Sequence, residues 1–380
     1  MRDLVQKIEE TTPAGRDRSV DALRALAIGG VVLGHWLVSA LVVESGSVRV
    51  ASPLRDMPYL APVSWILQTM ALFFLVGGQM TARSHASARA RGVGYGRWLR
   101  ARAARLLRPV AAVAVVWTVV ALVMLASGAD LKSVQALAKL VWSPLWFLLV
   151  YAGLTALTPL VARLHPAWPL AVVALVDLVR FGWGGPEWVG WVNLAAGWLV
   201  PYCLGAAWAR DRLNERTTGW ALLAGGAAVA AVLIVWAGYP ASMVGVPGAP
   251  ISNQSPPTLA AVAFGLAQCG AALLLRDPLR RMLARPALWA FVALANLSAM
   301  TIFLWHQTAM IAVTTLGLLA GRPLLGLHTV PGEPSWLLAR LAWLPAFALA
   351  LCVCWGAFHA YERARPAEPR IRAEEAQARP

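Results

Sequence analysis

The sequence predicts an all-α, polytopic integral membrane protein with about ten transmembrane helices and no appended soluble domain. Of its 380 residues, 59% are apolar and 13% are charged, and the mean hydropathy is +0.62. Soluble domains carry about 25% charged residues. The chain also holds roughly ten apolar runs near the ~20 residues that a helix needs to cross the hydrocarbon core. These observations exclude a water-soluble enzyme and a disordered chain.

The apolar runs follow one another along almost the whole chain. Spans are expected at 22–43, 60–82, 109–127, 143–162, 167–182, 188–209, 219–238, 258–275, 297–320 and 336–359. The fifth run is short and contains Asp177 and Arg180, whose i, i+3 spacing predicts a local ion pair. Residues 288–296 are expected as an interfacial segment that leads into the ninth span.

The distribution of positive charge predicts the orientation of the chain. The net charge is +15, with 33 basic and 18 acidic residues. In a membrane protein this excess marks cytoplasmic loops, so no nucleic-acid partner is expected. Connections on one side hold 25 Lys and Arg residues against 7 on the other. The richer side includes the tails 1–21 and 360–380, which are therefore expected in the cytoplasm on either side of a transmembrane domain, 22–359.

Three ionisable residues inside the expected spans are candidates for function, because charged groups at membrane depth are costly. Arg24 and His35 are eleven residues apart on the first span, which places them on one helix face, about 16 Å apart along the axis. His306 lies about 14 Å into the ninth span, near the expected depth of His35. This pattern suits a channel for an anionic ligand. The spacing alone leaves open that Arg24 reaches lipid headgroups and the histidines pack between helices.

The connection 83–108 is the most basic part of the chain, with eight arginines. If the chain after Gly96 is helical, four of them form a stripe: Arg97, Arg100, Arg105 and Arg108. Arginine binds phosphate groups through paired hydrogen bonds. The stripe therefore suits either the headgroups of anionic lipids or the phosphates of a cytoplasmic donor. The four cysteines show no metal-ligand spacing, and no metal site is expected.

Five segments form a series in chain order. They are Arg18-Ser-Val-Asp21-Ala-Leu23-Arg24 continuing to His35-Trp36, Phe73-Phe74-Leu-Val-Gly77-Gly78, Arg105-Leu-Leu-Arg108-Pro109, Leu145-Trp146-Phe147-Leu-Leu-Val-Tyr151, and Leu297-Ser298-Ala-Met-Thr-Ile-Phe-Leu-Trp-His306. The series resembles the motifs of the membrane-bound acyltransferase-3 family. Its Arg-x-x-Arg motif fits three pairs here, namely Arg97/Arg100, Arg102/Arg105 and Arg105/Arg108. Ala299 and Phe303 stand where the family often has tyrosines.

The resemblance implies an O-acyltransferase of the bacterial inner (plasma) membrane. It would move an acyl group, usually acetyl, from cytoplasmic acyl-CoA to a hydroxyl of a cell-surface glycan or a secreted metabolite. His35 would act as general base or transient acyl carrier, Arg24 would orient the donor, and His306 would position the acceptor or its oxyanion. Five arginines would bind the donor: Arg97, Arg100, Arg102, Arg105 and Arg108.

The resemblance also sets the expected partners. Acyl-CoA is the donor substrate, no metal takes part, and membrane lipid surrounds the chain. Many relatives carry a fused extracytoplasmic domain, so a separate extracytoplasmic partner is an open expectation here.

Two other function classes stay open. One is a transporter or flippase for a lipid-linked sugar or metabolite, although Asp177 is the only intramembrane carboxylate that could couple transport to protons. The other is an inactive relative that only binds lipid or a partner protein.

Overall fold

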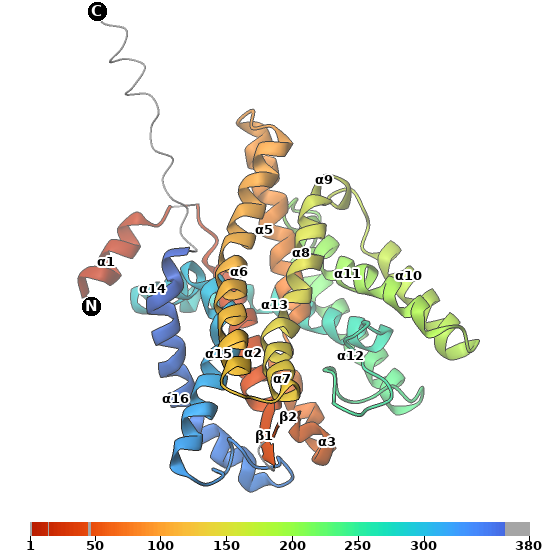
Figure 1. Cartoon of the computed structure of the whole chain (residues 1–380). Coiled ribbons are helices and arrows are strands. Elements are labelled where there is room, and N and C mark those ends of the chain that lie inside the picture. The colour runs from red at the N-terminus through yellow and green to blue at the C-terminus, as the bar shows by residue number, and fades with distance from the viewer. Residues whose placement is uncertain (1, 14, 45–46, 362–380) are drawn as a thin grey trace, which may run out of the picture.

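The computed structural model describes residues 2–13, 15–44 and 47–361, and helices make up most of them (Figure 1). Nine helical stretches within these ranges are long and apolar enough to cross a membrane. They are Arg18–Val38, Pro58–Ala90, Tyr95–Ala126, Leu131–Ala156, Glu187–Trp208, Glu215–Val235, Leu259–Met282, Ala299–Ala320 and Pro334–Tyr361. The prediction of an all-α polytopic membrane protein is confirmed. Of the predicted C-terminal tail, residues 362–380 lie outside the described residues.

The elements follow one another in a simple order. The first half of the chain contains α1 (Arg2–Thr11), α2 (Arg18–Val38), β1 (Ala40–Glu44), β2 (Ser47–Ala51), α3 (Pro53–Asp56), α4 (Ala61–Ser64), α5 (Met70–Ala90), α6 (Tyr95–Ala126), α7 (Leu131–Trp142), α8 (Trp146–Ala156) and α9 (Thr158–Val161). The second half contains α10 (Ala167–Asp177), α11 (Val192–Trp208), α12 (Glu215–Val235), α13 (Leu259–Met282), α14 (Pro286–Leu297), α15 (Ala299–Gly317) and α16 (Pro334–Phe358).

The first predicted span is too long at its C-terminal end. Helix α2 stops at Val38, and the following apolar residues form β1, which pairs antiparallel with β2 in the register Ala40↔Ala51. The strands are rich in valine, which fits a pleated strand better than a helix interior. This hairpin lies at one end of the molecule, and the connection between α5 and α6 lies at the other (Figure 1). We call these the hairpin end and the arginine end.

The fifth predicted span is shorter than the others. Helix α10 ends at Asp177 and continues only as a π turn over Leu178–Gly182. The predicted Asp177–Arg180 ion pair is wrong. The Asp177 carboxylate instead accepts hydrogen bonds from Asn193 Nδ2 at 3.0 Å, Tyr239 Oη at 2.9 Å and the Leu259 amide at 2.7 Å. Three neutral donors from other elements surround the carboxylate, so it joins α10 to α11 and α13.

Helices α5 and α11 cross at backbone contact. A Cβ atom on Gly78 would collide with the Tyr202 carbonyl oxygen, and one on Gly205 would collide with the Leu75 carbonyl oxygen. Small residues at such crossings let membrane helices approach closely, where van der Waals packing replaces the hydrophobic effect as the driving force. The Gly77-Gly78 motif therefore sets the position of α11 against the centre of the molecule.

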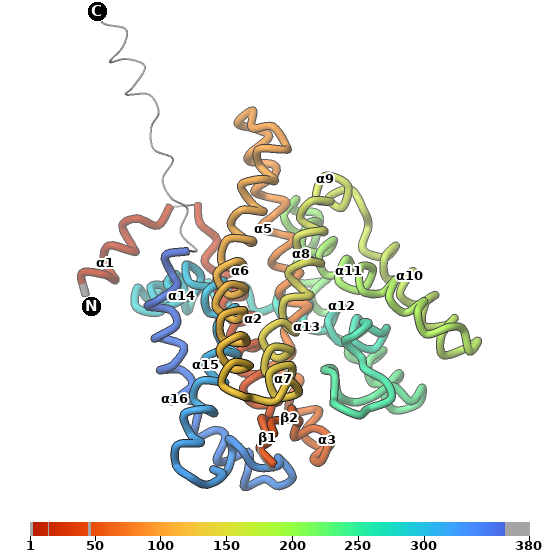
Figure 2. Tube along the Cα trace, in the orientation of Figure 1, coloured from red at the N-terminus to blue at the C-terminus, as the bar shows by residue number. Residues whose placement is uncertain are grey.

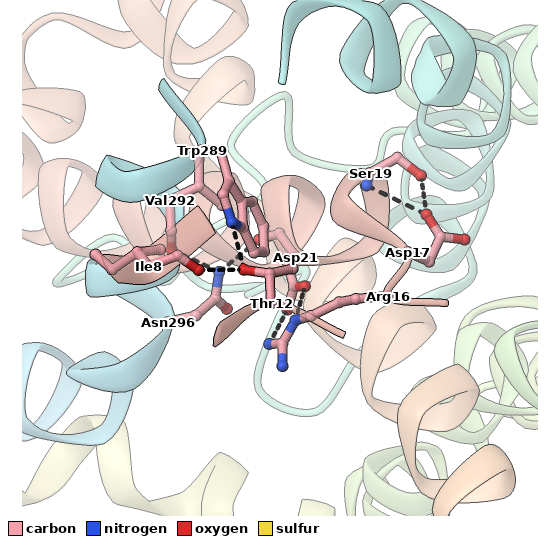
Figure 3. A network of polar contacts seen from close by, with 9 residues as sticks. All are labelled: Ile8, Thr12, Arg16, Asp17, Ser19, Asp21, Trp289, Val292 and Asn296. Atoms are coloured by element: carbon pink, nitrogen blue, oxygen red, sulfur yellow. Dashed lines mark hydrogen bonds and ion pairs between the residues drawn. The ribbon is translucent and has the colours of Figure 1, made fainter. Parts of the chain in front are cut away.

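A polar network attaches the N-terminal segment to α14 and α2 (Figure 3). Trp289 Nε1 donates to Thr12 Oγ1 at 2.9 Å, and Asn296 Nδ2 donates to the Asp21 carbonyl oxygen at 2.8 Å. Arg16 forms an ion pair with the Asp21 carboxylate at 2.7 Å. The predicted interfacial segment 288–296 is thus part of α14, a 12-residue helix that packs against α1 and α2.

A second network joins the N-terminus of α2 to α12 and α13. Arg276 donates to the Asp17 carboxylate at 2.8 Å and also pairs with Glu215. Burial opposes ionisation of Asp17, but hydrogen bonds from Ser19 and Arg276 and the charge of Arg276 outweigh it, so the pKa of Asp17 lies below its ordinary value. This network holds together three helices that are far apart in sequence.

Candidate functional site

The side chains of His35 and His306 meet between α2 and α15. Their ring centroids are 5.1 Å apart. The next residue after His35 fixes the contact, because Trp36 Nε1 donates to the His306 carbonyl oxygen at 2.9 Å. The two helices lie side by side in the centre of the molecule (Figure 2), although 270 residues of chain separate them.

The protonation pattern of His306 follows from its surroundings. The residue is 0% exposed, and its Nδ1 lies 2.5 Å from the Phe303 carbonyl oxygen one turn earlier in α15. A carbonyl oxygen only accepts hydrogen bonds, so Nδ1 carries the proton and Nε2 keeps a lone pair in the neutral ring. Among the described residues, Nε2 is buried without a hydrogen-bond partner. The lone pair at Nε2 is therefore left without a donor, although His306 itself does not line the cavity that His35 borders.

His35 lies in the wall of a cavity of about 670 Å³. This His35 cavity is at the hairpin end, where Val50, Ala51 and Ser52 of the hairpin region also line it. Aromatic side chains and four glutamines make up much of the remaining wall. Among the described residues that line the cavity, Lys139 is the only lysine or arginine. A volume of this size is in the range of small-molecule sites.

A fully buried arginine, Arg340, fixes the end of α2 next to His35. Arg340 is 0% exposed and donates to the carbonyl oxygens of Trp36 and Ser39, each at 2.7 Å, and of Gly326 at 2.9 Å. The last carbonyl groups of a helix have no partner within the helix, and a cation there also interacts favourably with the helix dipole. Arg340 thus supplies hydrogen-bond donors to carbonyl groups at the end of α2, in the turn that carries His35, and connects this turn to α16.

Sequence reasoning did not single out Arg340 as a candidate residue. Arg340 lies six residues after the start of α16 and is buried in protein. A usable signal was present, because an ionisable residue within an apolar run is a functional or structural candidate by default.

Toward the arginine end, Arg24 lies near a small group of polar side chains. Arg102 of α6 interacts electrostatically with Tyr151, Tyr202 and Arg24, and also with Arg105 of its own helix. The Tyr151 hydroxyl lies 3.4 Å from Thr81 Oγ1, and the Tyr202 hydroxyl lies 3.0 Å from Thr158 Oγ1. We call Arg24, Arg102, Tyr151 and Tyr202 the arginine–tyrosine cluster. Sequence reasoning quoted Tyr151 only as part of a motif and did not single out Tyr202.

All four arginines of the predicted stripe lie on the outside of α6. Helix α6 begins at Tyr95, so the chain after Gly96 is helical. Arg102 is partly buried, whereas the other four are exposed: Arg97, Arg100, Arg105 and Arg108. The structure therefore brings Arg102 alone of this set toward the arginine–tyrosine cluster.

The arrangement places a base that borders a cavity, His35, and one member of the arginine–tyrosine cluster, Arg24, on the same helix. Arg24 and His35 belong to the same uninterrupted helix, α2, so their separation along the axis is about 16 Å. A neutral histidine beside a cavity can take a proton from a hydroxyl group, and guanidinium groups can bind anionic oxygens. Within the described ranges, no group of three His, Cys, Asp or Glu side chains is placed to hold a metal ion.

The comparisons with known proteins agree with the motif series. The model of a family described as an acyltransferase domain matches residues 17–359, a range that includes α2, the α6 arginines and His306. No curated protein and no solved structure gives a significant match. Because the family match covers most of a polytopic helical chain, the chain belongs to the acyltransferase-3 family of membrane acyltransferases.

Proposed function

We propose that this membrane acyltransferase moves an acyl group, usually acetyl, from acyl-CoA to a hydroxyl group, with His35 as the base or transient acyl carrier. The observation that carries the proposal is the position of His35. It lines the His35 cavity, contacts the ring of His306, and follows Arg24 on one helix. The acceptor is a hydroxyl of a cell-surface glycan or a secreted metabolite.

The donor binds from the arginine end. Acyl-CoA carries several phosphate groups, and the exposed arginines of α6 offer paired donors for phosphate oxygens. Arg24 and Arg102 lie deeper along the route toward His35, and their guanidinium groups orient the thioester end of the donor. In this proposal the arginine end faces the cytoplasm of a bacterial inner membrane, as the positive-inside rule predicts, and both termini are cytoplasmic.

His35 performs the proton transfer. As general base, His35 takes the proton of the acceptor hydroxyl while its oxygen attacks the thioester carbonyl carbon. The carbon–sulfur bond then breaks, the thiolate of CoA takes up the proton, and an ester remains on the acceptor. As a transient carrier, the His35 ring would first accept the acyl group and then pass it to the hydroxyl.

His306 positions the acceptor. Its Nδ1–H is occupied by the Phe303 carbonyl, so the neutral ring offers a lone pair at Nε2. This lone pair accepts a hydrogen bond from the acceptor hydroxyl. Stabilising an oxyanion would require a proton at Nε2, which this tautomer lacks.

Binding of acetyl-CoA and release of free CoA thiol test this proposal. The assay compares purified wild type with His35→Ala and with His359→Ala, a matched control because His359 is half-buried, stacks on Trp355 and does not line the cavity. We expect all three proteins to bind acetyl-CoA. Thiol release by His35→Ala is expected to be at least about 100-fold slower than that by wild type and by His359→Ala.

The other outcomes are informative. Unchanged thiol release by a folded His35→Ala variant would refute the role of His35. If neither acetyl-CoA nor longer acyl-CoAs bind, a transporter or flippase becomes the better explanation of the function of this protein.

A further inference from the structure

Three glutamine side chains in the wall of the His35 cavity hold amide oxygens without partners. Gln68 precedes α5, Gln268 belongs to α13 and Gln307 follows His306 on α15. Among the described residues, the Oε1 atom of each is buried and accepts no hydrogen bond. Buried polar atoms are almost always hydrogen-bonded in native proteins, so three such oxygens in one cavity require an explanation.

The orientation of the Gln68 amide is fixed by its neighbour. Gln68 Nε2 lies 2.6 Å from Ser64 Oγ, and Ser64 Oγ lies 2.7 Å from the Ala61 carbonyl oxygen. The single hydroxyl proton of Ser64 goes to that carbonyl, so Ser64 can only accept from Gln68. In this arrangement the NH₂ group faces Ser64, and Oε1 is left without a donor.

The orientation of the Gln268 amide is fixed by the backbone. Its Nε2 donates to the Gln68 carbonyl oxygen at 2.9 Å. Because a carbonyl oxygen cannot donate, the NH₂ group of Gln268 must face it and Oε1 must face away. Gln307 is 1% exposed, so bulk water does not reach its amide oxygen directly. The contacts of Gln68 and Gln268 thus orient two of the amides, and the third oxygen, on Gln307, is likewise buried without a donor among the described residues.

The rest of the wall narrows the choice of ligand. Trp146, Trp198 and Phe264 line the same cavity, and Trp198 Nε1 is also buried without a partner among the described residues. No described Asp or Glu lines the cavity. A ligand that fits must present several O–H donors to the amide oxygens, offer an oxygen to the indole, and cover aromatic faces with its C–H groups.

We propose that Gln68, Gln268 and Gln307 form an amide subsite that binds a molecule with several neighbouring hydroxyl groups. The subsite recognises the hydroxyl groups next to the one that receives the acyl group. The proposal rests on the proposed function in one respect, which is that the molecule in the cavity is the acyl acceptor. Binding itself requires no donor and no catalysis, so it is tested separately.

The probe is methyl α-glucopyranoside, compared with its fully O-methylated derivative, which has the same ring but no O–H donors. Saturation-transfer-difference NMR measures binding to the full chain in phosphatidylcholine nanodiscs without acetyl-CoA. Glycoside detergents are left out because their sugar headgroups present the same hydroxyls. We expect binding of the free glycoside and at least about tenfold weaker binding of the methylated one.

The variants Gln268→Met and Gln307→Met test the residues. Each is expected to weaken binding of the free glycoside about threefold to tenfold, the range for one lost hydrogen bond. Gln135→Met on the exposed face of α7 is the matched control and is expected to bind as wild type does. Ala261→Trp, which fills the cavity from α13, is expected to abolish the signal and so to assign it to this cavity.

Thermal unfolding separates a binding role from a structural one. Gln307→Met removes a buried oxygen that has no partner, so its Tm is expected to equal or exceed that of wild type. A large loss of Tm in Gln307→Met would assign the amide to folding and overturn its role in binding.

Three NMR outcomes would also overturn the subsite: equal binding of both glycosides, no binding of either, or binding unaffected by the glutamine variants. None of these outcomes changes the expected His35-dependent thiol release, so the proposed function is tested separately by its own assay.

Discussion

The two ring nitrogens of His306 have different neighbours, and this difference can be tested at the scale of a single side chain. Nδ1 is bonded to the Phe303 carbonyl, whereas Nε2 is free for a ligand. The structure thus separates the nitrogen that holds the ring from the nitrogen that has no partner, which is the one that the proposed function uses.

We predict that His306→Gln keeps more activity than His306→Asn. The glutamine amide reaches the place of Nε2 and can offer an oxygen there, whereas asparagine reaches only the place of Nδ1. Acetyl-CoA-dependent thiol release in the presence of acceptor is expected to fall at least about tenfold further in His306→Asn. Equal losses in two folded variants would show that the Nε2 position is not used.

The crossing of α5 and α11 is a property of elements. Gly78 and Gly205 let the two backbones touch, and Gly77 makes room for the Tyr151 ring. The crossing therefore also places Tyr151 and Tyr202 in the arginine–tyrosine cluster.

We predict that Gly78→Ala and Gly205→Ala each lower the free energy of unfolding by about 1–3 kcal/mol, the usual cost of overpacking. Gly225→Ala in α12 is the matched control, because a Cβ atom there meets nothing within 4 Å. It should be neutral or slightly stabilising, since alanine favours a helix more than glycine does. Thermal unfolding in one detergent compares the three. A Gly78→Ala protein as stable as wild type would contradict the close crossing.

The register of α6 decides which arginines face the interior. Arg102 approaches Arg24, Tyr151 and Tyr202, whereas Arg108 is exposed on the same helix. Sequence reasoning could not choose among the three Arg-x-x-Arg pairs, because all of them satisfy the spacing.

We predict that Arg102→Gln raises the KM for acyl-CoA about tenfold or more, because it removes a charge from the proposed donor route. Arg108→Gln is the matched control, and its KM should stay within about threefold of wild type. The KM values are measured by thiol release at varied acetyl-CoA concentration. A larger rise in KM for Arg108→Gln than for Arg102→Gln would place the donor contact on the exposed stripe. No change in KM for either variant would indicate that these arginines contact lipid instead.

At the scale of the whole molecule, the network of Asp17, Arg276 and Glu215 links the N-terminus of α2 to α12 and α13. The pKa of Asp17 is lower in the folded protein than its ordinary value, so folding favours the ionised carboxylate. Its stabilisation is complete above the unfolded-state pKa of about 3.9 and is lost as pH falls through the lower folded-state pKa.

We predict that Asp17→Asn lowers the Tm at pH 7 and that the difference from wild type shrinks as the pH falls below about 4. Asp3→Asn, at an exposed position of α1, is the control and should change the Tm little at either pH. Thermal unfolding of both variants and wild type at several pH values measures this. A constant difference across the pH range would show that the ionisation of Asp17 does not matter to folding.

The sequence by itself determined which segments are membrane helices and which residues are unusual in them. Hydropathy is a local property, so each of the nine candidate spans overlaps a predicted run. The fifth predicted run, 167–182, is not among them, and several helices extend well beyond the predicted bounds, as Tyr95–Ala126 does beyond 109–127. The cost of placing Arg24, His35 and His306 in apolar runs is local too, so the sequence alone was enough to single out these residues as candidates. The break after Val38 was missed, because an apolar, valine-rich segment suits a strand as well as a helix.

Only the tertiary structure decided which of these residues meet. The contact of His35 with His306, the bonds of Arg340 to the end of α2, the partners of Asp177 and the inward position of Arg102 all join segments from different helices. Helix crossings depend on how particular side chains pack, and glycines such as Gly78 set them at backbone contact. A one-dimensional pattern reports which residue is costly in a membrane, whereas three-dimensional packing determines the partner that makes it stable there.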